Sequence, residues 1–419
     1  MIDTLAYAIL AGEPEVAAIV ERCSFTLGRN WRWVEPLARR YIEATGSSLR
    51  PRHREVVQFL FDDAYFHRAY VKHRHELKIA RWIMPPVQWR HFGWDVPAIA
   101  TSGDLADWLA LTPSELDWFA DLKAWGCKKG SPKLRHYRYR VLDKGNGSFR
   151  SIEAPKPRLK WIQERMLAGI LDKIPPHPAA NGFVKKRSVK TFAAPHVGQR
   201  VVLRMDLKDF FPSISGARVQ TVFRTFGYPE AVADLLGGLG TNRVPRDVSR
   251  DTIYERPHLP QGAPTSPALA NICFYRADCR LYGLAESAGA HYTRYADDLA
   301  FSGGEDLDRR VERFSAHVAA ILLEEGFAVN HRKTRIMRQG VRQHLAGMVA
   351  NHVLNIRRAD YDCLKATLTN CLRHGPEGQN RDGHTDFRAH LEGRVGWAAS
   401  INPERGQKLR ALLAKIEWT

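Results

Sequence analysis

Three aspartates at the ends of predicted strands constrain this 419-residue chain more than any other feature. Asp206 follows the apolar run at residues 201–205, which is typical of a buried strand. Asp297 and Asp298 stand in the middle of residues 291–302, a stretch that predicts a β-hairpin with these aspartates at its turn. Carboxylates among apolar strand residues are costly unless they are paired or bound to cations. Aspartates 91 positions apart (297 − 206) can meet when two central strands lie side by side, so the sequence predicts one carboxylate cluster.

A cluster of this kind suits divalent metal ions. Two such ions about 3.5–4 Å apart can activate a 3′-hydroxyl and stabilise a leaving pyrophosphate. Because Mg²⁺ prefers oxygen ligands, we expect Asp206 and Asp297 to bind two Mg²⁺ ions, with Mn²⁺ as an alternative. We expect Asp298 to bind weakly or to act through the other ligands. An Asp-Asp pair by itself is more often a simple turn, so the assignment depends on the rest of the chain.

The charge balance indicates a polyanionic partner. Lys and Arg number 63 and Asp and Glu number 45, which leaves a net charge of +18. A basic protein without a specific partner is the plain alternative, and an anionic membrane is weaker because no long basic amphipathic anchor is visible.

The same sequence predicts a cytoplasmic protein that does not enter a membrane. No apolar stretch is long enough to span a bilayer, and residues 1–4 contain no positively charged leader. None of the six cysteines forms a C-x-x-C pair, so reduced thiols are expected.

The predicted elements divide the chain into a helical first part and a mixed second part. Residues 1–126 read as helical and are expected to bind RNA or a partner protein. Within them, residues 112–115 form a capping box, and residues 54–84 predict an aromatic and basic helix. Residues 137–152 predict a basic β-hairpin. Further helices are predicted at residues 159–174, 265–288 and 308–326, and from residue 357 onward.

Four short strings follow one another in an order typical of one family. Residues 295–298 (YADD) resemble the active-site box of reverse transcriptases. Residues 206–214 (DLKDFFPSI) resemble the family's first metal-binding motif, and residues 259–267 (LPQGAPTSP) resemble the motif that positions template and incoming nucleotide. Residues 330–334 (NHRKT) resemble a later motif that carries a basic residue.

The resemblance implies an α/β right-hand polymerase with RNA-directed DNA polymerase activity and dNTPs as substrates. Residues 127–200 would form the fingers. Residues 201–350 would form the palm, with an antiparallel sheet and the catalytic aspartates, and residues 351–419 a helical thumb. Residues 1–126 would be a helical N-terminal extension.

The family's motifs also imply roles for residues around the incoming nucleotide. Phe211, five positions after Asp206, would pack against the sugar and reject a 2′-hydroxyl, which favours DNA synthesis over RNA synthesis. A core phenylalanine is the alternative, and it fits Phe210, which should point to the opposite face. At Gln261 and Gly262 the backbone would approach a base pair closely, since glycine has no side chain. An ordinary Pro-Gly loop is the alternative there.

Three basic residues are assigned to phosphates. Arg150 and Lys144, in the predicted hairpin, would meet the triphosphate, for which arginine is the better clamp. Lys333 would neutralise or protonate the leaving pyrophosphate. The alternatives are a solvated basic turn for the hairpin residues and a surface lysine for Lys333.

Within the family, the chain is most similar to the retron branch of bacterial reverse transcriptases. Residues 152–160, 175–183 and 401–406 carry this resemblance. It implies a structured noncoding RNA as template and primer, synthesis from an RNA 2′-hydroxyl, an RNA–DNA hybrid product, and antiphage defence with an effector protein. A reverse transcriptase of another bacterial group, or an RNA-binding scaffold with a silent polymerase site, is the alternative.

Two strings depart from the retron pattern. Phe192 replaces the asparagine of Asn-Ala-x-x-His, although His196 is kept and is assigned to RNA. Residues 345–347 read Leu-Ala-Gly where Val-Thr-Gly is usual. RNA-primed synthesis is therefore less firmly implied than polymerisation.

Two further groups of basic residues are expected to contact nucleic acid. In residues 52–82, Arg68, Lys72 and Arg74 alternate with aromatic residues and are assigned to RNA, the alternative being an aromatic core face with a solvated basic face. The thumb would lay its basic residues along an A-form duplex. They are Lys365, Arg373, Arg388 and Arg394. Trp397 is predicted to lie in the thumb core.

Overall fold

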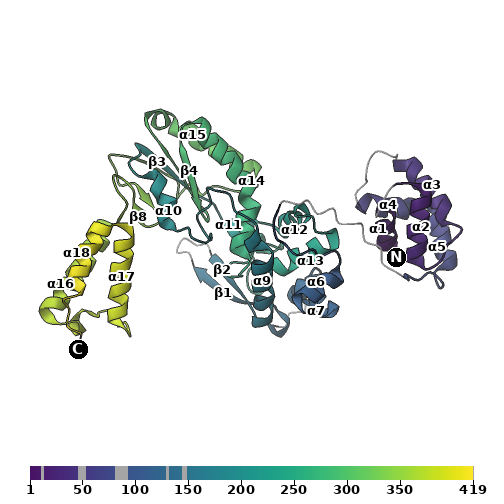
Figure 1. Ribbon diagram of the computed structural model, residues 1–419, viewed down its shortest axis with the longest axis horizontal. Coiled ribbons are helices and arrows are strands. Elements are labelled where there is room, and N and C mark those ends of the chain that lie inside the picture. Colours follow the sequence, from purple (N-terminus) through teal and green to yellow (C-terminus); the bar gives the residue numbers. More distant parts are fainter. Residues whose placement is uncertain (11–13, 46–52, 81–92, 129–131, 144–148, 419) are drawn as a thin grey trace. The chain divides into compact units, whose positions relative to one another are not determined.

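The computed structural model describes the chain except for residues 11–13, 46–52, 81–92, 129–131, 144–148 and 419 (Figure 1). The chain forms two compact units. The first contains residues 1–123 and 220–239, and the second contains residues 124–219 and 240–419. Residues 220–239 lie inside the stretch predicted as palm, yet they belong to the first unit. No helix in the described ranges is both long and apolar enough to cross a membrane.

The first unit is helical. It begins with a bundle of five helices whose core includes Leu5, Ile19, Leu37 and Phe66. The helices are α1 (Ile2–Leu10), α2 (Val16–Leu27), α3 (Val34–Thr45), α4 (His53–Asp62) and α5 (Ala64–His73). Later helices of this unit are α6 (Ser102–Leu109), α7 (Pro113–Ala120), most of α12 (Gly216–Thr225) and α13 (Glu230–Gly240).

Two predictions for this unit had different outcomes. The capping box at the start of α7 is confirmed, since the Thr112 side chain accepts from the Glu115 N–H and Glu115 accepts from the Thr112 N–H. The prediction of a single helix over residues 54–84 is wrong, because α4 ends at Asp62 and a new helix, α5, begins after Asp63. This carboxylate caps α5 by accepting from the Phe66 N–H at 2.6 Å, and it also binds Arg40 at 2.7 and 2.9 Å.

The second unit is built around a four-stranded antiparallel sheet. Its strand order is β4 (His291–Tyr295), β5 (Asp298–Gly303), β3 (Val201–Asp206) and β6 (Arg335–Arg338). Alternate side chains of β4 point to opposite faces. Tyr292 contacts α14 (Ser266–Ser287) through Asp278, whereas Thr293 donates to the Phe192 carbonyl oxygen on α10 (Val189–Ala193). Both faces are covered, which explains why β3 is buried along its length except at Arg204, which is partly buried.

A separate β-hairpin, several helices and short 3-10 turns also belong to the second unit. The hairpin pairs β1 (Tyr137–Asp143) with β2 (Phe149–Pro155), as predicted. The α-helices are α8 (Trp125–Lys128), α9 (Pro157–Gly169), α11 (Phe210–Ser213) and α15 (Glu305–Glu324). Short 3-10 turns are η1 (Pro132–Leu134), η2 (Leu171–Lys173), η3 (Ala194–His196), η4 (Thr252–Tyr254) and η5 (Glu377–Gln379).

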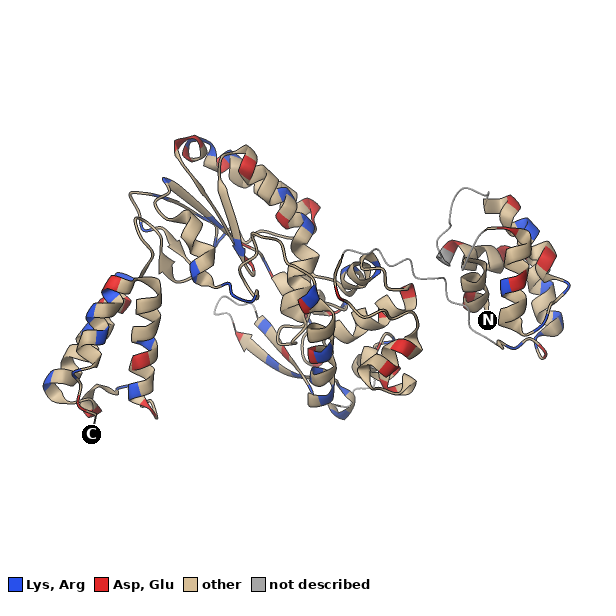
Figure 2. Ribbon diagram, in the orientation of Figure 1, with Lys and Arg blue, Asp and Glu red and all other residues tan. Residues whose placement is uncertain are grey.

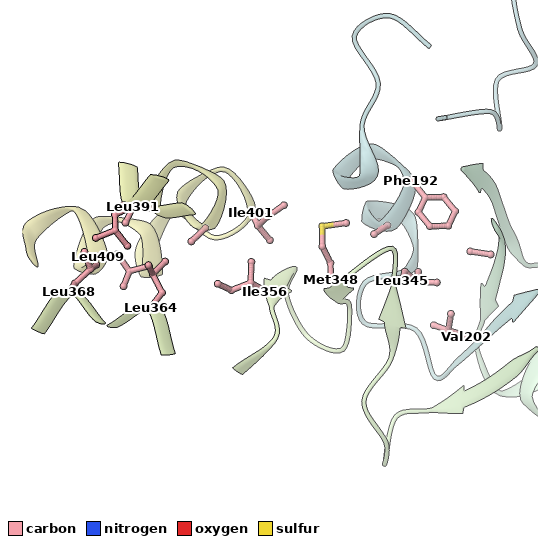
Figure 3. Packing of buried hydrophobic residues seen from close by; sticks show 14 of the residues in the cluster. Phe192, Val202, Leu345, Met348, Ile356, Leu364, Leu368, Leu391, Ile401 and Leu409 are labelled. Atoms are coloured by element: carbon pink, nitrogen blue, oxygen red, sulfur yellow. The ribbon is translucent and has the colours of Figure 1, made fainter. Parts of the chain in front are cut away.

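The C-terminal part is a small sheet followed by three helices. The strands are β7 (His344–Leu345), β8 (Met348–Val349) and β9 (Asn355–Ile356), and the helices are α16 (Arg358–His374), α17 (Phe387–Ile401) and α18 (Pro403–Leu413). Figure 3 shows one apolar cluster that runs from Val202 through Met348 to Leu391. The prediction that Trp397 lies in the core is wrong, because its side chain is 47% exposed.

Candidate active site

The paired aspartates stand at a two-residue turn between β4 and β5. Tyr295 pairs with Asp298, so only Ala296 and Asp297 form the turn. Ala296 has a φ of +56°, which a residue other than glycine adopts only when its surroundings hold it there. Gly182 packs against this backbone so closely that a Cβ atom on it would lie 2.5 Å from the Ala296 nitrogen. The turn is therefore fixed by its neighbours.

The prediction that the two aspartate-bearing strands lie side by side is confirmed. Asp206 and Asp298 are register partners on β3 and β5, and the Leu207 N–H donates to the Asp297 carbonyl oxygen at 3.0 Å. The pKa of Asp297 is raised above its ordinary value, first by burial and then by the negative charges of Asp206 and Asp298. Crowded carboxylates in this position favour a bound cation.

Two basic side chains meet these carboxylates. Arg204 donates to Asp298 from two nitrogens, and Lys333 Nζ donates to Asp206 Oδ2 at 3.0 Å. Among the described residues, no group of three or more His, Cys, Asp or Glu side chains is arranged to hold a metal ion. Asp298, predicted as a metal ligand, is thus paired with a guanidinium in this structure.

The two neighbouring phenylalanines differ in burial as predicted, but their rings do not point to opposite faces, since they contact each other edge-on with centroids 5.6 Å apart. Asp209 has a φ of +47°, and the short helix α11 follows it. Phe210 is buried against Phe274, with ring centroids 5.7 Å apart. Phe211 is half-buried, and its ring contacts Phe183 edge-on at 6.0 Å.

Gln261 and Gly262 lie beside the β1–β2 hairpin. The Glu153 N–H donates to the Gln261 carbonyl oxygen at 2.8 Å, and a Cβ atom on Gly262 would lie 2.9 Å from the Glu153 carbonyl oxygen. Gly262 also has a φ of +130°, so no other residue fits here without strain. Gln261 Oε1 is buried and has no hydrogen-bond partner. Arg150 is exposed on β2, and Lys144 lies outside the described residues.

The assignment of His196 to RNA is wrong. Its side chain is fully buried, and its ring nitrogens lie 2.7 Å from Ser302 Oγ and from Thr293 Oγ1. Because Thr293 donates its own proton to the Phe192 carbonyl oxygen, His196 Nε2 donates to Thr293 and Nδ1 accepts from Ser302. Burial lowers the pKa of His196 to about 3. It is a neutral core residue, and Phe192, in the place of the usual asparagine, is buried beside it.

The basic residues assigned to RNA on α5 are exposed. Arg68, Lys72 and Arg74 are open to solvent, and the Arg68 guanidinium lies 4.9 Å from the Tyr65 ring centre. The charge excess, however, lies elsewhere. Residues 1–80 contain 12 Lys and Arg and 10 Asp and Glu, so they contribute 12 − 10 = +2 of the +18. Figure 2 shows both signs interspersed on the helices α1–α5.

Comparison with known proteins decides the family. Residues 141–357 match the family described as "Reverse transcriptase (RNA-dependent DNA polymerase)". The chain is 38% identical over 393 residues to Retron Mx65 reverse transcriptase of Myxococcus xanthus, which covers 92% of this chain and 81% of that protein. The chain belongs to the retron-type reverse transcriptases. It is an RNA-directed DNA polymerase with the right-hand polymerase fold.

Other relatives of this reverse transcriptase are also retron enzymes. Retron Mx162 reverse transcriptase of Myxococcus xanthus is 35% identical, over 75% of this chain and 67% of that protein. Retron Ec86 reverse transcriptase of Escherichia coli is 31% identical, over 68% of this chain and 82% of that protein.

The sequence did not lead us to several polar residues around the site of this reverse transcriptase. Arg204 stands two positions before Asp206, so strand alternation places both on one face and could have identified it. Arg294 and Asp278 form a fully buried ion pair at 2.6 Å, and Glu153 contacts His258 at 3.0 Å. Residues of the second pair are 105 positions apart, and no local pattern marks them.

Proposed function

We propose that this enzyme reverse-transcribes a structured noncoding RNA that it binds as template and primer, by nucleotidyl transfer with two divalent ions. The observation that carries the proposal is the meeting of Asp206, Asp297 and Asp298 at the ends of β3 and β5, in an enzyme of this family. The relatives are named as retron reverse transcriptases, and the resemblance to that branch implies the noncoding RNA and a role in antiphage defence beside an effector protein.

The donor set fits magnesium. Carboxylate oxygens are the ligands that magnesium prefers, and the raised pKa of Asp297 reflects burial and the negative charges of Asp206 and Asp298, which a divalent ion would offset. Asp206 and Asp297 would hold the ions, with Asp298 contributing through Arg204 or after release from it. Bound there, the ions would activate the primer hydroxyl and stabilise the leaving pyrophosphate. Lys333 would hold a proton close to the leaving group, since it already lies 3.0 Å from Asp206.

The nucleotide pocket would be formed by parts that correspond to fingers and palm. The β1–β2 hairpin would act as fingers, with Arg150 on the triphosphate. Phe211 would close the pocket on the sugar side, where the exposed part of its ring would exclude a 2′-hydroxyl. Gln261 would meet the base pair through its backbone, because its amide oxygen is buried. Helices α16–α18 would act as the thumb along the RNA–DNA hybrid.

Two measurements on the purified protein test this proposal. Sequencing the nucleic acid that co-purifies should return one structured RNA, joined to DNA if the enzyme primes on it. Primer extension should proceed with dNTPs and Mg²⁺ and be far weaker with rNTPs. Co-purification of RNA without any extension would instead support an RNA-binding scaffold.

A further inference from the structure

A carboxylate in the middle of β2 is completely buried. Glu153 is 0% exposed. Its Oε1 lies 3.0 Å from His258 Nε2, and its Oε2 accepts a hydrogen bond from Asn242 Nδ2 at 2.7 Å. His258 itself is 1% exposed. A buried ionised carboxylate is costly unless charge and hydrogen bonds compensate it, so this arrangement needs both partners.

The hydrogen bonds fix how many protons the pair holds. His258 Nδ1 lies 2.8 Å from the Arg256 carbonyl oxygen, which can only accept, so Nδ1 carries a hydrogen. Nε2 faces Glu153 Oε1, so one more proton must lie between them. The pair is therefore an imidazolium beside a carboxylate, or a neutral imidazole beside a carboxylic acid. In both forms a strong hydrogen bond joins β2, which carries Glu153, to the segment that carries His258.

This bond joins segments that are distant in sequence. The Glu153 backbone is bonded to Gln261, and the His258 backbone exchanges two hydrogen bonds of 2.9 Å with Asn242. The same loop is tied to the segment after Phe211, because the Leu259 N–H donates to the Ile214 carbonyl oxygen at 3.1 Å. The hairpin, the loop at residues 258–261 and the segment after Phe211 are thus linked, the first two through the bond between Glu153 and His258 and the last two through the backbone.

Each of these segments carries a proposed nucleotide contact. Arg150 stands three positions before Glu153 on β2, Gln261 stands three positions after His258, and Phe211 precedes Ile214 by three positions. We infer that Glu153 and His258 are positioning residues for the incoming nucleotide. The bond between these two side chains sets the hairpin, the Gln261 loop and the Phe211 segment at the spacing that a dNTP requires. This inference rests on the proposed nucleotide contacts.

Further hydrogen bonds fix the residues around Glu153 and His258 in place. Asn242 Nδ2 also donates to the Tyr139 hydroxyl at 3.1 Å, and the Tyr254 hydroxyl accepts from the Ser151 N–H at 3.3 Å. Burial raises the pKa of Tyr254, so its hydroxyl stays neutral. A purely structural pair would contribute only to stability. A positioning pair also changes nucleotide affinity, because displacements of about 1 Å in a reaction site can cost on the order of 10²-fold.

The test compares Glu153→Gln, His258→Gln and the double variant in steady-state extension of a fixed primer–template with Mg²⁺. The KM for dNTP should rise about tenfold in each single variant, kcat should change much less, and the Kd for primer–template should stay at its wild-type value. The double variant should show a smaller rise than the product of the two single effects, since both remove the same bond. If Glu153→Gln does not fold, Asn242→Ala leaves the bond between Glu153 and His258 in place. It removes the second bond to Glu153 and the bond to the Tyr139 hydroxyl, and it should raise KM by a smaller factor.

Glu325→Gln is the matched control. Glu325 is also a buried glutamate of the second unit, but its side chain binds Arg276 and Arg280 at 2.9 Å. This variant should lower the melting temperature and leave the KM for dNTP unchanged. Unchanged KM in the Glu153, His258 and Asn242 variants of an active enzyme would overturn the inference alone. A wild-type protein that extends no primer would overturn the proposed function as well.

Discussion

Arg204 donates hydrogen bonds from two nitrogens to the same oxygen of Asp298, at 3.0 and 2.7 Å. Both side chains are largely buried. The adjacent aspartates therefore differ, because Asp298 is neutralised by a guanidinium whereas Asp297 has a raised pKa among negative charges. From this difference we expect Asp297 to be the stronger metal ligand, with Asp298 contributing through Arg204 or after release from it.

Arg204→Gln should expose the repulsion among the carboxylates. Without metal, loss of a charged hydrogen bond should cost about 1–2 kcal/mol and lower the melting temperature by about 2–4 °C. Mg²⁺ should restore part of this loss, since it replaces the missing positive charge. Thermal unfolding with and without Mg²⁺ measures both effects. An equal loss of stability with and without Mg²⁺ would argue against a metal site shared by these carboxylates.

Phe211→Ala should relax sugar selection. Removing the half-buried ring opens space beside C2′, so discrimination between dNTP and rNTP should fall roughly tenfold or more. The ratio of kcat/KM for dTTP and UTP on one template is the measurement. Phe210→Ala serves as the control, because Phe210 lies in the core and its loss should cost about 3–5 kcal/mol of stability without changing the ratio. Unchanged rNTP rejection in folded Phe211→Ala would move the selection elsewhere.

His196 should make the protein sensitive to acid. Its pKa is lowered to about 3 in the folded state, while the unfolded chain takes up the proton near 6.5. The neutral ring thus contributes stability that is complete above pH 6.5 and is lost as the pH falls towards 3. Between pH 6.5 and pH 5 the wild type should lose roughly 2 kcal/mol more than His196→Gln in urea unfolding. Parallel pH profiles would contradict the buried neutral assignment.

Neutralising Arg68, Lys72 and Arg74 together tests whether α5 binds RNA. If these side chains meet phosphates, binding of the native RNA should weaken, and its log–log salt slope should fall by roughly 0.7–0.9 for each phosphate that is no longer neutralised. Extension of a preannealed generic primer should hardly change. Arg29, Arg32 and Arg39 are exposed in the same bundle, and neutralising them makes a control with the same change in net charge. Wild-type affinity across the salt titration would assign these helices to another role.

Much of the fold was predictable because its signals are local. The hairpin of β4 and β5, the capping box at α7 and the helix α14 each follow from patterns within about twenty residues. The break at Asp63 was missed because a good cap stood inside a helical pattern. His196 and Trp397 were misplaced because burial depends on distant segments. The motif indicated a functional histidine at His196, but it did not show that the Ser302 and Thr293 hydroxyls enclose the ring in the core.

The candidate site also has a part that was predictable from the sequence and a part that was not. The three aspartates could be identified from motifs, whereas the bond between Glu153 and His258 depends on tertiary packing between segments 105 positions apart. The charge excess of +18 was a poor guide to the N-terminal helices, since net charge is a property of the whole chain and says nothing about where the cations lie.

The central claim is that Asp297 is a metal ligand of a DNA polymerase, and Asp297→Asn tests it most directly. Asparagine keeps the shape but removes the charge, so several kcal/mol of metal-dependent stabilisation should be lost, and extension with dNTPs and Mg²⁺ should fall about 10³-fold or more. RNA affinity should remain near the wild-type value. Asp308→Asn is the control, because Asp308 binds Arg200 and Arg338 rather than the aspartate cluster, and it should extend primers normally. Extension by folded Asp297→Asn at a rate close to that of the wild type would contradict the account.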